Sequence, residues 1–546
     1  MKSNRLFSVF QIALLALPAF FLLYLWKTWF WFLVPLPTNG LEYATGFLLL
    51  WYVLGLMFFD FPRPRMSSRW QWIAVILFLV AATVATAETV LHLEKGRAVP
   101  LGIWKGWFMA PATYFFLLIA SFRSRDELKK LIDVTIGIIA FTAGAMLLQY
   151  FSGIFSEVTA TYDLRLVWPY LDPLSGLGTS GNYPALFISP FLAMAWIMLM
   201  RSQKGLDRWY YAIGILMMLA TVYFTQSYGA WMAVIGACAV ASFFRTHGKT
   251  RWVIVPFMTL LLLGGLYLDQ KNSEKFQFAV DTTQENVIGS GEERLNIWAV
   301  SWDLIERDPL WGVGPGQFQR AFERQAPFTL NRDVSRQEIN HALHTHNTFL
   351  MFWLSNGIFG VLTFLLLFGV LIWSIPREWR WVLLTPLLYY LLHGLIDVFY
   401  WKNDLAYSFW FFAGLIVIAQ NLNTVSGKVE HGIKMGRELG FPTANIQLDL
   451  KLNKDYGVYA VILRIEKEKK MGLLYYGPRM TKGLPENMVC EVTVLDFEGD
   501  LYDKKISFKI GKFIRGPMKF DSPEELKKQI QKDILVARNK RFKISA

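Results

Sequence analysis

Residues 347–374 read NTFLMFWLSNGIFGVLTFLLLFGVLIWS and contain no charged side chain. A helix of this length can cross the ~30 Å hydrocarbon core of a bilayer. Comparable apolar runs recur outward from this one along most of the chain. Further spans are expected at about 7–26, 44–60, 70–90, 103–121, 131–151, 184–200, 209–225, 228–244, 252–268, 381–400 and 404–420. The sequence therefore predicts a polytopic α-helical membrane domain of about twelve spans.

The composition changes sharply near residue 421. The 546-residue chain is 54% hydrophobic and only 18% charged, with a mean hydropathy of +0.32, whereas soluble proteins carry about 25% charged residues. Residues 421–546, however, hold 24 Lys/Arg, 16 Asp/Glu and none of the 22 Trp. This composition disfavours an ordinary soluble enzyme. We expect two domains, a membrane domain at 1–420 and a polar domain at 421–546.

The positive residues of the membrane domain concentrate in alternate loops. If the N-terminus is cytoplasmic, 17 Lys/Arg lie in inside loops and six in the short outside loops. This bias predicts cytoplasmic N- and C-termini and an outer loop at about 269–346. The net charge of +13 is spread over such loops, so no nucleic-acid partner is expected. The two cysteines, Cys238 and Cys490, suggest neither a disulfide framework nor a metal site.

The outer loop carries the most informative segment of the membrane domain. It reads RLNIWAVSWDLIERDPLWGVGPGQF from Arg294 to Phe318, and HTHNTFLMFWLSNGIFG follows from His344 to Gly360. One face at helical spacing is apolar enough to lie on a membrane: Ile297, Val300, Ser301, Leu304 and Ile305. The glycines at 312, 314 and 316 permit a tight turn. They are only weak evidence for a phosphate-binding loop.

These segments resemble the O-antigen ligase and polymerase superfamily. The resemblance implies glycan transfer from a polyprenyl-pyrophosphate donor at the outer face of a bacterial inner membrane. It implies that Arg294 engages the pyrophosphate, that His346 serves in catalysis and that Asn347 beside it binds the substrate. The stretch GLGTSGNYPAL at 176–186 matches another family segment, and Arg165 upstream is a candidate second cation for substrate binding. At 226–229 this chain has QSYG where the family commonly has Ser-Arg-Gly.

The chemistry fits these residue types. ATP is absent outside the cell, so the glycan donor must carry its own leaving group. A lipid pyrophosphate provides one, and arginine forms charge-assisted hydrogen bonds with its oxygens. A histidine can deprotonate an acceptor hydroxyl without a metal cofactor. Two alternatives stay open. His341, His344 and His346 could chelate a metal ion, and the domain could be a transporter, although its spans are almost free of charge apart from Glu88, His393 and Asp397.

The polar domain has the pattern of a small antiparallel β-barrel closed by a helix. Strands are expected at 456–465, 471–476, 488–496 and 504–510. A final helix is predicted to begin after Ser522, because Pro523 and Glu525 complete an N-terminal capping signal. If the membrane domain has an even number of spans, this barrel is cytoplasmic.

The barrel sequence resembles the riboflavin kinase (flavokinase) family. The similarity is carried by GKVEHGIKMGRELGFPTANI at 427–446 and CEVTVLDFEGDLYDKKI at 490–506. The family implies phosphoryl transfer from ATP to riboflavin, giving FMN, with Mg²⁺ as cofactor. It also implies a role for each matched residue: Thr443 and Asn445 as metal and phosphate ligands, Glu491 as the base, and Gly432 to Gly436 as part of a nucleotide loop.

The segment LLYYGPRMT at 473–481 departs from the family pattern, which usually has an Asn and a second Pro there. No soluble nucleotide-binding domain precedes the barrel, so FAD synthesis is not expected. The alternatives are a glycan ligase or transporter whose tail senses flavin or nucleotide without turnover, and a junction at residue 421 that joins two reading frames. Glycan acceptor and oligomeric state are not encoded in any motif that we recognise.

Overall fold

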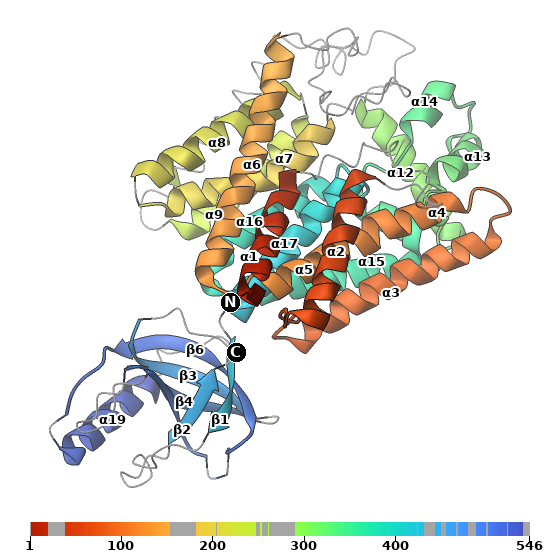
Figure 1. Ribbon diagram of the computed structural model, residues 1–546. Coiled ribbons are helices and arrows are strands. Elements are labelled where there is room, and N and C mark those ends of the chain that lie inside the picture. The colour runs from red at the N-terminus through yellow and green to blue at the C-terminus, as the bar shows by residue number, and fades with distance from the viewer. Residues whose placement is uncertain are drawn as a thin grey trace. The chain divides into compact units, whose positions relative to one another are not determined.

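The protein was analysed as a computed structural model (Figure 1). The residues that it describes are 2–19, 39–152, 182–203, 205–225, 227–246, 252–253, 260, 290–422, 424–430, 443–448, 455–465, 468–478, 488–497, 499, 501–520 and 522–538. The chain forms two compact units, one of residues 1–122 and 126–418 and one of residues 123–125 and 419–546. The first is helical, and the second contains the β-structure.

The helical unit contains long apolar helices together with shorter or more polar ones. They are α1 (Lys2–Ala16), α2 (Gly40–Phe58), α3 (Arg69–His92), α4 (Ala98–Ile103), the π-helix η2 (Trp104–Met109), α5 (Ala110–Ser121), α6 (Arg125–Ser152), α7 (Asn182–Arg201), α8 (Gly205–Phe224), α9 (Tyr228–Arg245), α12 (Ser290–Arg307), α13 (Phe318–Leu330), α14 (Arg336–His341), α15 (Thr348–Ser374), the 3-10 helix η4 (Arg377–Trp379), α16 (Arg380–Gly394) and α17 (Asn403–Asn421).

Seven helices among the described residues are long and apolar enough to cross a membrane. They are 40–58, 69–92, 98–121, 125–152, 183–201, 228–245 and 348–374. The protein is therefore a membrane protein. The number of about twelve spans stays a prediction, since the expected spans at 7–26 and 252–268 lie partly outside the described residues.

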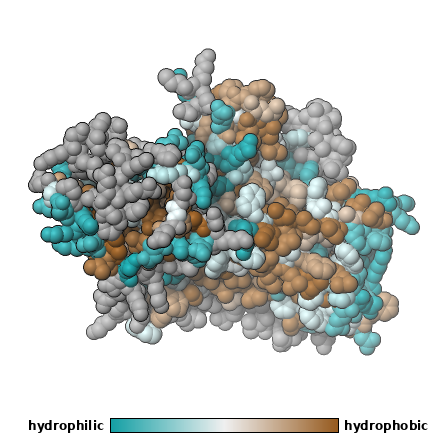
Figure 2. Space-filling view, turned by 90° about the horizontal axis from the view of Figure 1, so that it is seen from below, coloured by the Kyte–Doolittle hydropathy of each residue, from teal (hydrophilic) through white to brown (hydrophobic). Residues whose placement is uncertain are grey.

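The surface of the helical unit agrees with a lipid environment. Hydrophobic residues cover much of it on the face shown in Figure 2. Large apolar side chains of two helices are exposed, among them Phe47, Met57 and Phe58 of α2 and Ile76 and Val80 of α3. Exposed apolar surface of this extent is unfavourable in water and is expected on the lipid-facing side of a membrane helix.

Helix α15 is kinked where the glycine-rich turn at residues 312–316 meets it. Gly357 has φ +67°, and a Cβ atom there would collide with the carbonyl oxygen of Leu310. The backbone N–H groups of Val313 and Gly314 both donate to the carbonyl oxygen of Leu354, at 2.7 and 3.0 Å. The glycine run at 312–316 thus forms the expected tight turn, and its lack of side chains permits close backbone packing on α15.

The second unit, drawn in blue in Figure 1, is a closed antiparallel barrel, and its strand order is β1-β2-β5-β4-β3-β6. The strands are β1 (Thr424–Glu430), β2 (Thr443–Leu448), β3 (Gly457–Ile465), β4 (Glu468–Pro478), β5 (Met488–Val494) and β6 (Lys505–Arg515), and α19 (Pro523–Arg538) follows. The predicted fold class, a membrane domain followed by an antiparallel β-barrel with a terminal helix, is confirmed. Ser522 caps α19 as expected, because its Oγ accepts the N–H of Glu525 at 3.2 Å.

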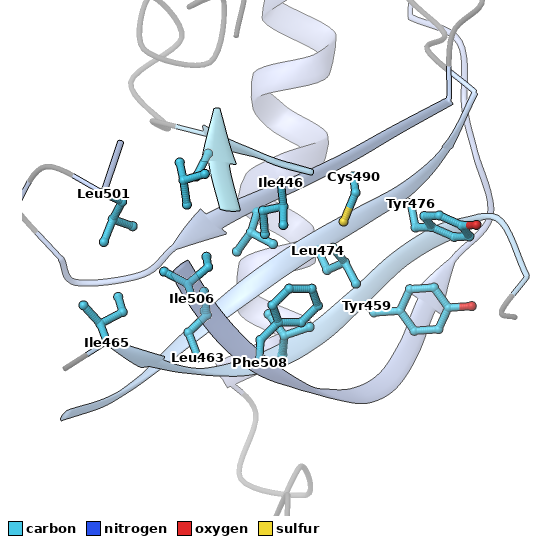
Figure 3. Packing of buried hydrophobic residues seen from close by; sticks show 14 residues of the cluster. Ile446, Tyr459, Leu463, Ile465, Leu474, Tyr476, Cys490, Leu501, Ile506 and Phe508 are labelled. Atoms are coloured by element: carbon cyan, nitrogen blue, oxygen red, sulfur yellow. The ribbon is translucent and has the colours of Figure 1, made fainter. Parts of the chain in front are cut away.

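Alternate residues of each strand fill the barrel interior. Figure 3 shows the inward side chains, among them Ile446 of β2, Leu474 of β4 and Cys490 of β5. Because neighbouring residues on a strand point to opposite faces, the residues beside these point outward. A second, smaller apolar cluster on the outer face joins Val458, Ala460 and Leu473 to Ala537 of α19. The helix therefore covers part of the outside of the barrel.

Candidate functional sites

Helix α12 is anchored beside the predicted catalytic histidine. Trp298 donates its indole N–H to the carbonyl oxygen of Thr345 at 2.8 Å, and Thr345 directly precedes His346. Arg294 lies one turn before Trp298, so the two side chains share a face of the helix. The five residues of the predicted apolar face, 297, 300, 301, 304 and 305, are all buried within the protein. The RxxxW spacing thus brings a half-buried arginine to the histidine segment.

Two histidines and one carboxylate form the centre of this site. His346 Nδ1 lies 3.7 Å from Asp397 Oδ1, which is an ion-pair distance but too long for a hydrogen bond. The rings of His344 and His346 are 4.2 Å apart, and the backbone N–H of His346 donates to His344 Nδ1 at 3.3 Å. His344 therefore carries its ring proton on Nε2 when it is neutral.

His346 adopts an unusual backbone conformation. Its φ angle is +48°, in the left-handed region that residues with a Cβ atom seldom adopt. Its Nδ1 atom is buried, and no hydrogen-bond partner for it occurs among the described residues. Backbone strain and an unsatisfied ring nitrogen both cost free energy, and such features concentrate at functional sites.

The electrostatic environment separates the two histidines. Burial and the neighbouring His346 ring lower the pKa of His344 to about 3, and the positive charges of Lys402 and Arg294 act in the same direction. The negative charge of Asp397 opposes them but does not outweigh them. His344 is therefore neutral at physiological pH. It can accept or donate a hydrogen bond beside His346 but supplies no charge.

The Asn347 amide group connects the start of α15 to the turn after α16. Its Oδ1 accepts the N–H groups of Phe349 and Leu350, both at 3.0 Å, and so caps α15. Its Nδ2 donates to the carbonyl oxygen of Leu395 at 3.0 Å, which ties α15 to the turn after α16. Both ends of the amide are thus engaged within the protein. This favours a positioning role for Asn347 beside His346, and its predicted contact with substrate stays a prediction.

Asp397 is the member of the site that motif reading missed. The apolar run at 381–400 predicted a continuous span, whereas α16 ends at Gly394 and Asp397 lies in the turn before α17. The available signal was a carboxylate within an apolar run, which usually marks function in membrane proteins. Arg165, the stretch 176–181 and the side chain of His341 lie outside what the structure describes.

His344, His346 and Asp397 could also hold a metal ion. One potential ligand atom from each lies within 4.8 Å of the others, and this is the group of metal-ligating residues found among the described residues. Nitrogen and carboxylate ligands with a neutral His344 suit a transition metal such as zinc. The alternative of a metal site therefore stays open, with Asp397 as its third ligand in place of His341.

The barrel brings the predicted kinase residues onto neighbouring strands. Asn445 of β2 lies directly opposite Glu491 of β5, and Thr443 lies opposite Thr493. On the other side of β5, Tyr475 of β4 lies opposite Glu491. Directly opposed residues have Cβ atoms about 4.5–5.5 Å apart and share a face of the sheet. Thr443, Asn445 and Glu491 therefore form one half-buried group on the outside of the barrel.

The negative charge of Glu491 affects the residues beside it. Burial raises the pKa of Cys490 to about 12, and the Glu491 charge adds to the shift. Burial and Glu491 also raise the pKa of Tyr475, whose hydroxyl donates to the carbonyl oxygen of Pro478 at 2.6 Å. Thr443 and Asn445 offer a hydroxyl and an amide oxygen on the same face, and such hard oxygen ligands fit Mg²⁺. Gly432 and Gly436 lie outside the described residues.

Comparison with known proteins gives two family matches. Residues 420–540 match the family model described as riboflavin kinase, and residues 213–365 match the model described as O-antigen ligase. The chain carries a domain of each family. Both resemblances drawn from the sequence are confirmed. The first match includes the Asn445–Glu491 pair, and the second includes Arg294, His346 and the kink of α15.

Curated relatives match the barrel. The chain is 38% identical over 115 residues to the bifunctional riboflavin kinase/FMN adenylyltransferase of Listeria monocytogenes, covering 20% of this chain and 35% of the relative. The enzyme of the same name from Escherichia coli K12 is 40% identical over 116 residues, 21% of this chain and 36% of the relative. The RNA-binding riboflavin kinase RibR of Bacillus subtilis is 36% identical over 113 residues, which cover 21% of this chain and 49% of the relative. The chain thus spans half or less of each of these relatives.

Proposed function

We propose that residues 421–546 phosphorylate riboflavin to FMN with ATP. The observation that carries the proposal is the pairing of Asn445 with Glu491, with Thr443 on the same face of the barrel. The oxygen of the ribityl 5′-hydroxyl attacks the γ-phosphorus of ATP while Glu491 accepts the proton of that hydroxyl. The bond between the γ-phosphorus and ADP breaks, and ADP leaves with the bonding electron pair. Thr443 and Asn445 would hold Mg²⁺, which supplies neutralisation of phosphate charge when bound.

The test uses the full-length chain purified in detergent with riboflavin, ATP and Mg²⁺, and FMN is measured by chromatography. Glu491→Gln should lower the rate of FMN formation about 10²- to 10⁴-fold, the usual contribution of a general base. Glu468→Gln is the matched control, because this β4 carboxylate is 72% exposed and forms an ion pair with Lys470. A fully active Glu491→Gln enzyme would exclude the base. A wild-type chain that binds riboflavin without forming FMN would establish the sensing alternative.

We further propose that the membrane domain, residues 1–420, transfers a glycan from a polyprenyl-pyrophosphate donor. Arg294, anchored through Trp298 beside His346, supports this assignment. Arg294 pairs with pyrophosphate oxygens, and His346, with Asp397 near its Nδ1, takes the proton of the acceptor hydroxyl. The acceptor oxygen forms a bond to the anomeric carbon, and the bond from that carbon to the pyrophosphate oxygen breaks.

This activity can be tested in bacterial membranes that contain lipid-linked glycan. Wild-type protein should deplete the lipid-linked glycan, measured by mass spectrometry, and His346→Gln should leave it intact. His92→Gln is the control, since this histidine is exposed at the end of α3. Equal depletion by wild type and His346→Gln would contradict the role of His346. Loss of activity on chelation, restored by zinc, would favour the metal alternative for the same side chains.

The two reactions require different compartments. ATP is cytoplasmic, whereas the glycan donor is used at the outer face of a bacterial inner membrane. The positive residues of the loops support cytoplasmic N- and C-termini and an outer segment that carries Arg294 and His346. We therefore place the protein in the inner membrane, with the kinase domain inside and the histidine site outside.

A further inference from the structure

Lys402 lies in the turn that joins α16 to α17, the same turn that contains Asp397. The turn is fastened to the start of α15 by two hydrogen bonds. Thr348 Oγ1 donates to the carbonyl oxygen of Asp397 at 3.0 Å and accepts the backbone N–H of Phe399 at 3.2 Å. Because Thr348 follows His346 by two residues, this turn and the histidine segment form one structural element.

The Lys402 ammonium is held by an aromatic ring. Its Nζ atom lies 4.1 Å from the centroid of the Tyr183 ring, within the range of a cation–π interaction. The Tyr183 hydroxyl in turn donates to the carboxylate of Asp404, the second residue of α17. These contacts restrict where the ammonium can lie, although the side chain stays partly exposed to solvent.

The charge of Lys402 is not matched by a close carboxylate. Among the described residues, no Asp or Glu oxygen forms an ion pair with Lys402, whereas Lys105 Nζ contacts Glu42 Oε2 at 2.6 Å. Burial lowers the pKa of Lys402, and the more distant Asp404 and Asp397 oppose this shift. An enclosed ammonium without an ion-pair partner costs free energy, and a bound anion would recover it.

Lys402 and Arg294 act on the same centre from different elements. Arg294 is tied to the histidine segment through the hydrogen bond from Trp298 to Thr345, and Lys402 lies in the turn that Thr348 binds, so both cations are held next to that segment. Arg294 comes from α12 and Lys402 from the turn before α17. A pyrophosphate carries negative charge on both of its phosphate groups, and one arginine neutralises only part of it.

We propose that Lys402 is a second pyrophosphate-binding residue of the membrane domain, so that Arg294 and Lys402 together hold the two phosphate groups of the lipid donor beside His346. This inference rests on the proposed glycan transfer. When the acceptor oxygen bonds to the anomeric carbon, the electron pair of the broken bond goes to the pyrophosphate. The Lys402 ammonium stabilises that negative charge, while the acceptor proton goes to His346.

The test measures binding of undecaprenyl pyrophosphate and undecaprenyl monophosphate to the full-length protein in nanodiscs. Lys402→Gln should weaken binding of the pyrophosphate about tenfold or more and binding of the monophosphate much less. Lys402→Arg should stay within about threefold of wild type, because the positive charge is kept. Lys95→Gln is the matched control, since Lys95 is an exposed lysine of the predicted outer face.

The outcomes separate this inference from the proposed function. If Arg294→Gln loses pyrophosphate binding while Lys402→Gln binds as wild type does, Lys402 is not a ligand and the glycan-transfer proposal stands. If wild-type protein binds neither lipid, both proposals fail. If Lys402→Gln weakens binding of both lipids equally, the residue does not recognise the second phosphate.

A measurement on unmodified protein guards against a variant that misfolds. Undecaprenyl pyrophosphate should protect Lys402 from an amine-reactive reagent at least about fivefold, while labelling of Lys95, read by mass spectrometry of the same sample, stays unchanged. Equal labelling of Lys402 with and without the lipid would overturn the inference.

Discussion

Replacing Arg515 by methionine removes the ion pair that fastens α19 to the barrel. The guanidinium of Arg515, at the end of β6, contacts the Asp533 carboxylate through three N–O distances of 2.9 to 3.1 Å. The Asp533 side chain is only 4% exposed and also accepts a hydrogen bond from Gln529 at 2.9 Å. Methionine would fill most of the volume but leave a buried carboxylate without its cation. We expect a loss of about 3–5 kcal/mol in the free energy of unfolding of the barrel.

Cys490 provides the assay, because its thiol lies in the barrel core and reacts only when the barrel opens. When the barrel closes faster than the reagent modifies the thiol, the rate of Cys490 modification is proportional to the equilibrium constant for opening of the barrel. A loss of 3 kcal/mol corresponds to labelling that is about 150-fold faster. The modified peptide is quantified by mass spectrometry in the full-length protein, which separates it from the peptide of Cys238.

Arg538→Met is the matched control. Arg538 also joins α19 to the barrel, through Asp496 at 2.6 Å, but the two side chains are 52% and 78% exposed. An exposed pair contributes about 0–1 kcal/mol, so labelling of Cys490 should rise less than about fivefold. Equal effects of Arg515→Met and Arg538→Met would refute the argument from burial.

Three further predictions follow from single residues. Gly357→Ala should lower the Tm of the helical unit through a loss of more than about 1–2 kcal/mol, since an alanine at positive φ is strained and its Cβ meets the Leu310 carbonyl; Gly369→Ala in the same helix, where a Cβ meets nothing, should keep or raise it. The pKa of His344 is lowered to about 3 from 6.5, so below pH 6.5 the unfolded chain binds a proton that the folded chain does not. The Tm should therefore fall between pH 7 and pH 5, and less so in His344→Gln; an identical fall would contradict the shift. Thr443→Val should raise the Mg²⁺ concentration that gives half-maximal FMN formation several-fold with riboflavin KM little changed, and an unchanged Mg²⁺ dependence would exclude the hydroxyl as a ligand.

The sequence predicted the four strands whose own residues are rich in apolar and aromatic side chains. The expected strands at 456–465, 471–476, 488–496 and 504–510 coincide with most or part of β3 to β6, because these segments either alternate polar and apolar residues or are continuous runs rich in apolar and aromatic residues. β1 and β2 were not predicted. Their segments, TVSGKVE and TANIQL, are short and carry few large apolar side chains, although polar and apolar residues alternate in TANIQL, and they become strands by pairing with β6 and β5 as the barrel closes.

Both sites show the same division between local and long-range information. The residue types of Thr443, Asn445 and Glu491 could be read from motifs, but the register that sets Asn445 opposite Glu491 depends on closure of the barrel. In the membrane domain the motif gave His346, whereas Asp397 approaches it from the turn after α16. No local pattern encodes a contact between residues so far apart in the chain.

The most direct test of the whole account is the side of the membrane on which each site lies. Single cysteines replace Leu343, which is 62% exposed near His346, and Glu468 on the barrel, in a chain whose own cysteines are changed to serine. The cells have a permeabilised outer membrane and an intact inner membrane, and a membrane-impermeant maleimide is added. We predict labelling at position 343 in these cells and at position 468 only after lysis. Labelling of both positions, or of neither, before lysis would contradict a membrane that separates the two reactions.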